Sequence, residues 1–343
     1  MRFDFTDEQK AVRQAARDML QRRFPSQTVR ALCERNDYDP AHWSEMVTLG
    51  WPGLAVEERF GGLGMGVVGL VVLLEEMGRT LSPSPFLSNA AATLVLQAAG
   101  DDRQCERWLP RVVSGEARLG FAVAGERGTV LGIDVEGADA VVIVSPAAPG
   151  ASLATGVAAT PVETIDRARR FSHLREEAGD PLPGNVARGV QMVEVALSAE
   201  LVGVGQRALE MAVAHAQTRQ QFGRIIGTYQ AVSHRCADIF RAVESARSAT
   251  YNAAWAADSA AEVLPLAASV AKASAAGGAW KATADSLQVH GGIGFTWEHD
   301  LHLYLKRAVV DGTLLGSANE HYRRVAALAG LGADQPALAG AAV

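Results

Sequence analysis

The sequence predicts a mainly α-helical protein with a small β-sheet domain in the middle of the chain. Before about residue 115 and after about residue 186, apolar residues recur at helical spacing. Between these parts, short runs rich in β-branched residues alternate with Gly and Pro, as in strands joined by turns. We therefore expect an architecture of three parts: an N-terminal helical domain over residues 1–116, a reduced β domain over 117–185 and a C-terminal four-helix bundle over 186–343.

The N-terminal part begins with a helix start signal. Thr6 is followed three residues later by Gln9, which is a capping-box pattern, and the next apolar residues have helical spacing. Pro25 marks the expected end of this helix, because a proline cannot continue it. A second apolar segment runs from Val67 to Met77 and stops before a Ser-Pro-Ser-Pro run, and a further helical pattern covers residues 89–113.

The middle and C-terminal parts have clearer periodicity. We expect strands at residues 119–123 and 141–145. After residue 186 the first expected helix is long, with Leu197 and Leu201 on its apolar face. The remaining expected helices cover residues 231–257, 264–289 and 319–328. Helices in such succession favour an antiparallel bundle, which commonly associates with another bundle.

The composition is that of an ordinary globular protein, with 48% hydrophobic and 20% charged residues. A formal net charge of -6 gives no general attraction to nucleic acid or to anionic membranes, and no apolar run is long enough to cross a bilayer. The first residues lack the pattern of a signal peptide. Three widely spaced cysteines fit neither a disulfide framework nor a zinc site. These features predict a cytoplasmic protein with reduced thiols.

The first segment with candidate chemistry is Thr-Arg-Gln-Gln-Phe-Gly at 218–223, where the first bundle helix is expected to end. Gly223 and Gly227 would release the helix, which leaves Arg219 near its C-terminal turn, where a cation is favoured. An arginine fork beside Phe222 could hold a phosphate and cover an adenine ring. The alternative is purely structural: a helix-capping arginine and a core phenylalanine.

The second segment, Gln-Val-His-Gly-Gly-Ile-Gly-Phe-Thr at 288–296, ends another expected helix. Its glycines permit close approach of a ligand and expose backbone N–H groups that can donate to a phosphate. A glycine-rich helix end before a turn explains this segment alone equally well.

Two other patterns are set aside. Glu298, His299 and His302 resemble a metal cluster in composition, but their spacing leaves no third ligand, so we expect surface residues. The Gly-Val-Gly run at 203–205 imitates a dinucleotide-binding fingerprint, but it lies in a helical pattern with no strand before it. The sequence therefore predicts no metal site and no Rossmann-type site.

In combination, the two segments resemble the acyl-CoA dehydrogenase family. The resemblance rests on Arg-x-x-Phe-Gly at 219–223, Gln-x-x-x-His-x-x-Ala-Asp at 230–238 and Gln-x-x-Gly-Gly-x-Gly-Phe at 288–295. It extends to Phe-Thr-Asp-Glu-Gln at 5–9, Glu-Glu-Arg-Phe-Gly-Gly-Leu-Gly at 57–64 and Glu-Glu-Met-Gly-Arg at 75–79. It covers nearly the whole chain and implies the family's order of α domain, β domain and α bundle.

The resemblance implies an FAD-dependent enzyme that oxidises an acyl-CoA thioester between its α and β carbons. In the family a carboxylate base takes the α proton, hydride passes from the β carbon to flavin N5, and an electron-transfer flavoprotein or similar acceptor takes the electrons. Residues that match family contacts are expected to hold the adenine and diphosphate of a neighbouring subunit's FAD. These are Arg219, Phe222, Gln230, Gln288, Val289, Gly291 and Gly292.

The catalytic base does not match in its usual place. The family's usual base is a glutamate before the last helix, and the register set around Arg307 puts Leu315 there. Because a leucine cannot accept a proton, the base stays unassigned. Some family members carry the glutamate near the start of the first bundle helix, where Glu194 and Glu200 are candidates with a raised pKa. The alternative for both is a carboxylate paired with an arginine.

The middle domain also departs from the family pattern. The strand expected to contact the flavin, at 120–127, lacks the hydroxyl side chains that would meet it, and several strands are expected to be absent. Some bacterial members, including those of steroid side-chain catabolism, pair a full-length subunit with a short one that keeps the FAD grip but lacks the base. We therefore expect a short subunit in a heterotetramer with a full-length partner. The alternatives are a self-sufficient homomer that uses Glu194 or Glu200, and a non-catalytic structural subunit.

Overall fold

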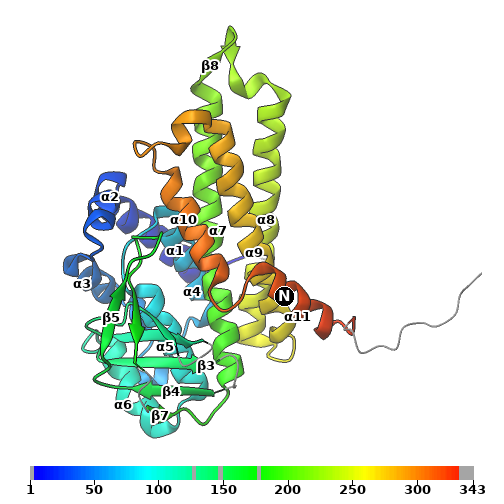
Figure 1. Ribbon diagram of the computed structural model, residues 1–343. Helices are drawn as coiled ribbons and strands as arrows, with labels where there is room; N and C mark the ends of the chain where they lie inside the picture. The colour runs from blue at the N-terminus through cyan, green and yellow to red at the C-terminus, as the bar shows by residue number, and fades with distance from the viewer. Residues whose placement is uncertain (1–3, 126–128, 146–149, 176–178, 332–343) are drawn as a thin grey trace, which may run out of the picture.

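The computed structural model describes residues 4–125, 129–145, 150–175 and 179–331. It confirms a mainly helical protein with a mixed sheet beside a helix bundle (Figure 1). The segment expected to contact a flavin, 120–127, lies partly outside the described residues, at 126 and 127. Within the described residues, every helix is too short or too polar to cross a bilayer.

The N-terminal helices follow the predicted start and stop signals, with one correction. They are α1 (Asp7–Arg23), α2 (Ser26–Arg35), α3 (Pro40–Thr48), α4 (Gly66–Thr80), α5 (Phe86–Ala99) and α6 (Asp102–Val113), with 3-10 turns at Trp51–Gly53 and Glu58–Phe60. The Thr6 hydroxyl accepts from the backbone N–H of Gln9 at 3.2 Å, which confirms the capping box. The prediction of one helix over 89–113 is wrong. Gly100 ends α5, and the Asp101 carboxylate caps α6 by accepting from the backbone N–H of Gln104 at 2.7 Å.

The sheet comprises β1 (Leu119–Ala124), β2 (Val130–Ile133), β3 (Ala140–Ser145), β4 (Gly150–Ala154), β5 (Ala159–Val162), β6 (Phe171–Leu174) and β7 (Asp180–Pro181). Its strand order is β5-β6-β2-β1-β3-β4-β7, and β1 and β3 run parallel while the other pairs are antiparallel. Polar groups of α5 fasten the sheet: the Ser88 hydroxyl accepts from the backbone N–H of Phe121 at 2.9 Å, and Asn89 Oδ1 accepts from that of Leu119 at 2.9 Å. The sheet therefore sits directly on α5.

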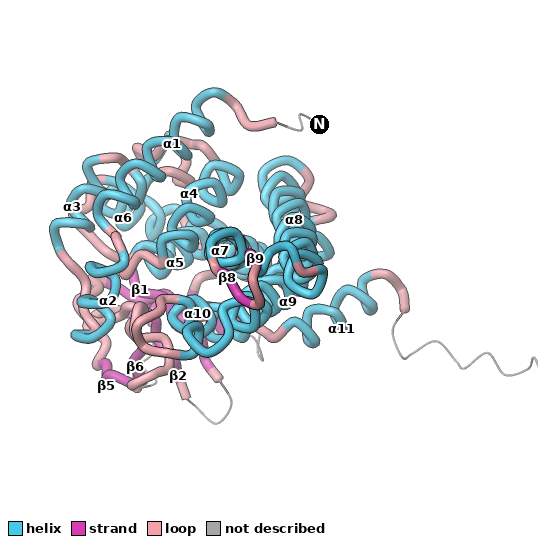
Figure 2. Tube along the Cα trace, turned by 90° about the horizontal axis from the view of Figure 1, so that it is seen from above, coloured by secondary structure: helices cyan, strands magenta, loops and turns pink. Residues whose placement is uncertain are grey.

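The C-terminal part is built on α7 (Val186–Thr218), α8 (Gln230–Ser259) and α9 (Leu264–His290), followed by α10 (Leu301–Thr313) and α11 (Ala318–Leu328). A small hairpin, β8 (Gln220–Gln221) with β9 (Arg224–Ile225), joins α7 to α8, and 3-10 turns occupy Ile226–Thr228 and Gly291–Phe295. The sequence pattern does not predict α10, which packs against α7 and α9. Seen end-on, the N-terminal helices and the sheet lie on one side of the bundle and α8 on the other (Figure 2).

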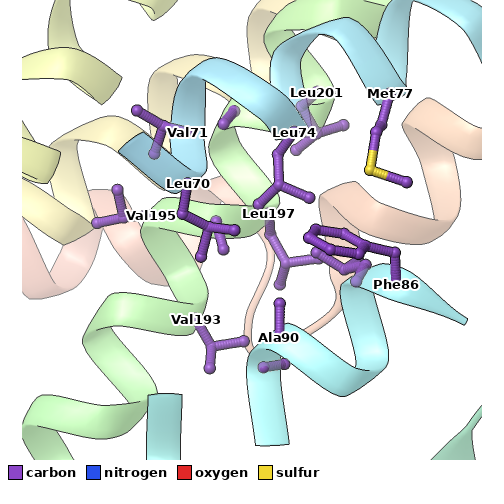
Figure 3. Close-up of a cluster of buried hydrophobic side chains, with 14 of the residues drawn as sticks. Leu70, Val71, Leu74, Met77, Phe86, Ala90, Val193, Val195, Leu197 and Leu201 are labelled. Carbon is purple, nitrogen blue, oxygen red and sulfur yellow. The ribbon is translucent and has the colours of Figure 1, made fainter. Parts of the chain in front are cut away.

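The contact between α4 and α7 is close because glycines form it. A Cβ added at Gly203 would lie 1.9 Å from the carbonyl oxygen of Glu75, and one added at Gly78 would lie 2.0 Å from that of Glu200. The two backbones can approach so closely only where no side chain intervenes. Around this contact, apolar side chains of α4, α5 and α7 form a shared core (Figure 3). The Gly-Val-Gly run that includes Gly203 is thus inside α7, as predicted.

A residue from the far end of the bundle caps α4. The Asp258 carboxylate, at the end of α8, accepts from the backbone N–H groups of Val67 at 2.8 Å and Val68 at 2.9 Å. These N–H groups belong to the first turn of α4 and have no partner within the helix. Asp258 therefore joins the N-terminal helices to the bundle as well as capping α4.

Candidate functional site

Arg219 and Phe222 stand on the hairpin at the tip of the bundle, which is the top of Figure 1. Arg219 is the C-cap of α7 and has extended backbone, so the chain leaves the helix four residues before Gly223. Gly223 does not end the helix but turns the hairpin, with φ of 79° next to Phe222 with φ of 51°. Two consecutive positive φ values match a tight hairpin turn. The phenylalanine is not a core residue, because its side chain is 93% exposed.

A shallow hollow of about 490 Å³ lies between this hairpin and the end of α9. Of the seven predicted cofactor residues, it brings together four: Arg219, Phe222, Val289 and Gly291. The other three, Gln230, Gln288 and Gly292, are exposed next to these positions but do not line the hollow. Segments about 70 residues apart in the sequence thus meet at one site.

The lining of the hollow fits the adenine and diphosphate half of FAD. Its floor contains the apolar side chains of Ile226, Val232 and Val289, which suit a flat ring. Within the described residues, no acidic side chain lines the hollow and the Arg219 guanidinium has no ion-pair partner. Phe222 holds a backbone conformation that costs about 1–3 kcal/mol for a non-glycine residue. A free guanidinium beside a strained, exposed aromatic ring is an arrangement suited to an anionic aromatic ligand.

Two histidines that the sequence analysis did not assign to the site form another wall of the hollow. The rings of His215 in α7 and His290 at the end of α9 stack with centroids 4.5 Å apart and planes 27° apart. His299 continues the group, with its centroid 4.4 Å from that of His290. Their only sequence signal is that His215 stands one helical turn before Arg219 and that His290 lies within the glycine-rich segment.

His299 and His302 are half-buried rather than on the open surface, which corrects the sequence expectation. His302 packs edge-on against Trp297 with centroids 4.6 Å apart. Among the described residues, no group of three or more His, Cys, Asp or Glu side chains has an arrangement that could hold a metal ion. These histidines therefore belong to aromatic clusters at the end of the bundle.

Leu315, where the sequence comparison predicts the family's base, lines a separate and very small apolar cavity of about 10 Å³. The other lining residues are Leu87, Ser88, Ala91, Phe121, Ile133, Val193, Leu197 and Leu314. A space of that size is at the lower limit for one water molecule. Figure 3 shows Val193 and Leu197 of α7 facing Phe86 and Ala90 of α5 in this region. The crevice between the sheet, α5 and α7 is thus filled by the protein's own side chains.

The turn that carries Leu315 is tightly braced. The buried ammonium group of Lys272 donates to the backbone carbonyls of Asp311, Gly312 and Gly316 at 3.0, 3.1 and 3.2 Å. His321 Nε2 lies 3.2 Å from the carbonyl oxygen of Leu315. Burial lowers the pKa of Lys272 to about 8, even though nearby carboxylates favour its charged form. Lys272 thus satisfies the carbonyl groups at the end of α10.

Glu194 and Glu200, the two candidate bases, have different environments. Burial raises the pKa of Glu194 to about 7, against the lowering effect of Arg324, which donates to its carboxylate at 2.8 Å. The expected raised pKa is confirmed for Glu194. It is wrong for Glu200, because the guanidinium groups of Arg169 and Arg307 more than offset the effect of burial and lower the pKa of that carboxylate.

Glu200 belongs to a buried cluster of five charged side chains that joins α7, α10 and the loop before β6. Its oxygens accept from Arg307 at 2.6 Å and from Arg169 at 2.7 Å. Arg307 also pairs with Asp166, and Arg169 with Asp311. All five side chains are at most 4% exposed. Burial raises the pKa of Asp311, and the nearby carboxylates of Glu200 and Asp166 act in the same direction.

The two domains of the acyl-CoA dehydrogenase family match this chain directly. The family model for the N-terminal domain matches residues 6–116, and that for the C-terminal domain matches residues 187–329. A Mycobacterium tuberculosis protein described as acyl-CoA dehydrogenase IpdE2 is 33% identical over 325 residues, which cover 93% of this chain and 96% of that protein.

Solved structures agree with the sequence matches. The steroid ACAD Tcur3481-Tcur3483, solved as its G363A variant, is 27% identical with a TM-score of 0.84, over 94% of this chain and 98% of that one. The ChsE4-ChsE5 complex from Mycobacterium tuberculosis has the same fold at 24% identity, with a TM-score of 0.84 over 98% of this chain and all of that one. The chain therefore belongs to the acyl-CoA dehydrogenase family.

Proposed function

We propose that this chain is one subunit of an FAD-dependent acyl-CoA dehydrogenase that catalyses α,β-dehydrogenation of an acyl-CoA thioester. In this proposal the enzyme is a heteromer, and a full-length partner subunit holds the flavin ring, the substrate and the base. This chain supplies the grip on the adenine and diphosphate of the partner's FAD. The bound flavin would accept hydride and pass the electrons to an electron-transfer flavoprotein or a similar acceptor.

The observation that carries the proposal is the unpaired Arg219 beside the exposed Phe222. The guanidinium offers several N–H donors in a fork that matches phosphate oxygens, and among the described residues no carboxylate lines the hollow to compete for it. Phe222 extends from the tip of the hairpin, where its ring can cover an adenine held by another chain. Gly291 and Gly292 leave open space where a side chain would stand, because an added Cβ would meet no atom within 4 Å. The backbone there is accessible to a ligand.

The crevice at Leu315 supports the proposal that the base and the substrate site belong to a partner subunit. The side chain at the base position cannot take a proton, and the surrounding cavity of about 10 Å³ has no room for an acyl chain. Glu200, the nearby carboxylate of α7, is engaged by two arginines. Two solved structures of this fold are described as pairs, Tcur3481-Tcur3483 and the ChsE4-ChsE5 complex. A short chain with a grip and no base would need such a partner.

The test is to purify the chain alone and co-expressed with a full-length acyl-CoA dehydrogenase subunit from the same organism. We expect little FAD and no thioester oxidation from the lone chain, and both flavin absorbance and turnover from the co-purified complex. Full FAD occupancy with turnover by the lone homomer would contradict the proposal.

Two variants separate the grip from general charge effects. Arg219→Ala should leave the complex assembled but reduce its FAD content and raise the Kd for added FAD roughly 10- to 100-fold, the range expected for loss of a charge-assisted contact of 1.5–3 kcal/mol. Arg103→Ala, on the exposed face of α6, removes an equal charge far from the hollow and should bind FAD normally. Equal FAD binding by all three complexes would remove the assigned role of Arg219.

Glu194 favours a second candidate function, a self-sufficient homomer that uses this carboxylate as base. Its pKa of about 7 suits proton abstraction near neutral pH, and the preceding residue, Val193, lines the crevice. Its carboxylate, however, is directed to Arg324. Turnover by the lone chain that is lost in Glu194→Gln would establish this function in place of the heteromer.

A further inference from the structure

The stacked histidines beside Arg219 form an imidazole wall of the hollow, here defined as His215 and His290. Hydrogen bonds set the tautomer of the inner ring. His290 Nδ1 lies 2.8 Å from the carbonyl oxygen of Ser286, which can only accept, so Nδ1 carries a hydrogen and Nε2 is free to take a proton. The adjoining His299 accepts at Nδ1 from the backbone N–H of Leu301 at 3.2 Å, so its protonation at that atom would break a hydrogen bond.

The charges that face this wall are almost all positive or neutral. Arg219 is the C-cap of α7, four residues beyond His215, and His290 is at the end of α9. The turn after α9 contributes His299, whose neighbour Asp300 is engaged by Arg30 at 2.5 Å. Burial, followed by the neighbouring histidines, lowers the pKa of His215, and burial lowers that of His290 as well. In the absence of a ligand, the wall is therefore neutral near pH 7.

His215 is the member of the wall placed to become charged when an anion arrives. It stands near the C-terminal end of α7, where the helix favours a cation. A charged His215 would lie close enough to the Arg219 guanidinium to be repelled by it, an unfavourable pair unless an anion neutralises it. Both side chains line the same hollow. An anion bound there would therefore favour the protonated form of His215.

We propose that His215 binds the diphosphate of the dinucleotide together with Arg219, as an imidazolium supported by the ring of His290, so that binding takes up one proton from solvent. This inference rests on the proposed role of the hollow in binding FAD. No covalent bond is formed or broken, and the proton moves from the buffer to a ring nitrogen of His215. Affinity should consequently rise as the pH falls through the window between the free and bound pKa values of the imidazole.

Isothermal titration calorimetry of FAD binding to the flavin-free complex tests the proposal. The diphosphate of FAD is a diester and does not itself titrate near neutral pH. Titrations at about pH 6.5, in the range where histidine changes charge, should be run in buffers of different ionisation enthalpy. The dependence of the measured heat on buffer enthalpy then gives the number of protons taken up. We expect an uptake between about half a proton and one. As the pH rises through the window, binding should weaken by up to about tenfold in total for each unit by which bound FAD raises the pKa of His215.

His215→Phe keeps a ring that can stack on His290 but removes the titrating nitrogen. We expect this variant to bind FAD with no net proton uptake and with a Kd that no longer depends on pH in this range. His234→Phe, at an exposed position on α8 outside the hollow, should behave as the parent protein. This pair controls for loss of a histidine as such.

The outcomes separate the two proposals. Saturable FAD binding without proton uptake, or with uptake unchanged in His215→Phe, would overturn the role of His215 and leave the proposed function in place. FAD binding that is unaffected by Arg219→Ala, or absent from every complex of this chain, would overturn the proposed function and the proton linkage with it.

Discussion

Replacing Gly203 by alanine tests the close contact between α4 and α7. The added Cβ would lie 1.9 Å from the carbonyl oxygen of Glu75 and 2.7 Å from the backbone nitrogen of Arg79. Both are backbone atoms, so no flexible side chain can move away, and the helices must separate by roughly 1.5 Å to restore an ordinary contact. Overpacking of a core costs roughly 1–3 kcal/mol, and a backbone clash belongs at or above the upper end. At roughly 2–4 °C per kcal/mol, Tm should fall by about 5–10 °C.

Gly277 provides a matched control with the opposite expected sign. It lies within α9, and a Cβ added there would meet nothing within 4 Å. Gly277→Ala should therefore be neutral or stabilise the chain by up to about 1 kcal/mol, because alanine has the higher helix propensity. Thermal unfolding of the three proteins at equal concentration, followed by circular dichroism and checked by urea titration, measures the difference. The reasoning is refuted if Gly203→Ala is as stable as the parent, or if both substitutions destabilise equally.

Three further predictions concern Glu194, Asp258 and Leu315. Burial raises the pKa of Glu194 from 4.5 to about 7, so the folded state binds this proton more tightly than the unfolded chain does. The free energy of unfolding should therefore fall as the pH rises from about 4.5 to 7, by at most about 3 kcal/mol. Glu194→Gln should remove that fall, as urea unfolding across this range would detect. Asp258→Ala should cost about 1–2 kcal/mol in urea unfolding through loss of the α4 cap. Leu315→Glu should destabilise the lone chain most at neutral pH, because the new carboxylate would be buried among apolar side chains. The variant should also yield no thioester oxidation. Turnover by it would show that the crevice opens to substrate.

The parts of the fold that the sequence predicts depend on local signals. The capping box of Thr6 and Gln9 acts within one helical turn, and it is present as predicted. Gly100 is a signal for the end of a helix, but the apolar residues on both sides of it have helical spacing and suggest one continuous helix. The α10 helix is missed because its buried face includes Arg307 and Asp311, and charged side chains conceal the apolar periodicity.

For the candidate site too, the sequence predicts what local motifs determine but not the contacts that depend on the tertiary structure. The motifs predict that Arg219 and Phe222 share a region with Val289 and Gly291, and these four residues line one hollow. Their role toward FAD stays a prediction, as do the domain boundaries at 116 and 185. The environment of Glu200 could not be predicted, because Arg169 lies in a loop and Arg307 is more than 100 residues away in the sequence. Such partners become visible only when the tertiary structure brings them together.

The hollow at Arg219 and the crevice at Leu315 differ in whether nearby charged side chains are already paired. This difference supports the proposal of a site shared between subunits. Near the crevice, Arg169 and Arg307 hold Glu200 within the buried cluster of five charged side chains, where breaking such an ion pair is costly. These groups cannot turn to a substrate without leaving a buried charge uncompensated. At the hollow, Arg219 is exposed and, within the described residues, no carboxylate is part of the lining. Charged groups that are open to a ligand therefore lie at the tip of the bundle and not in the crevice, which supports the proposal that this chain completes a neighbour's site.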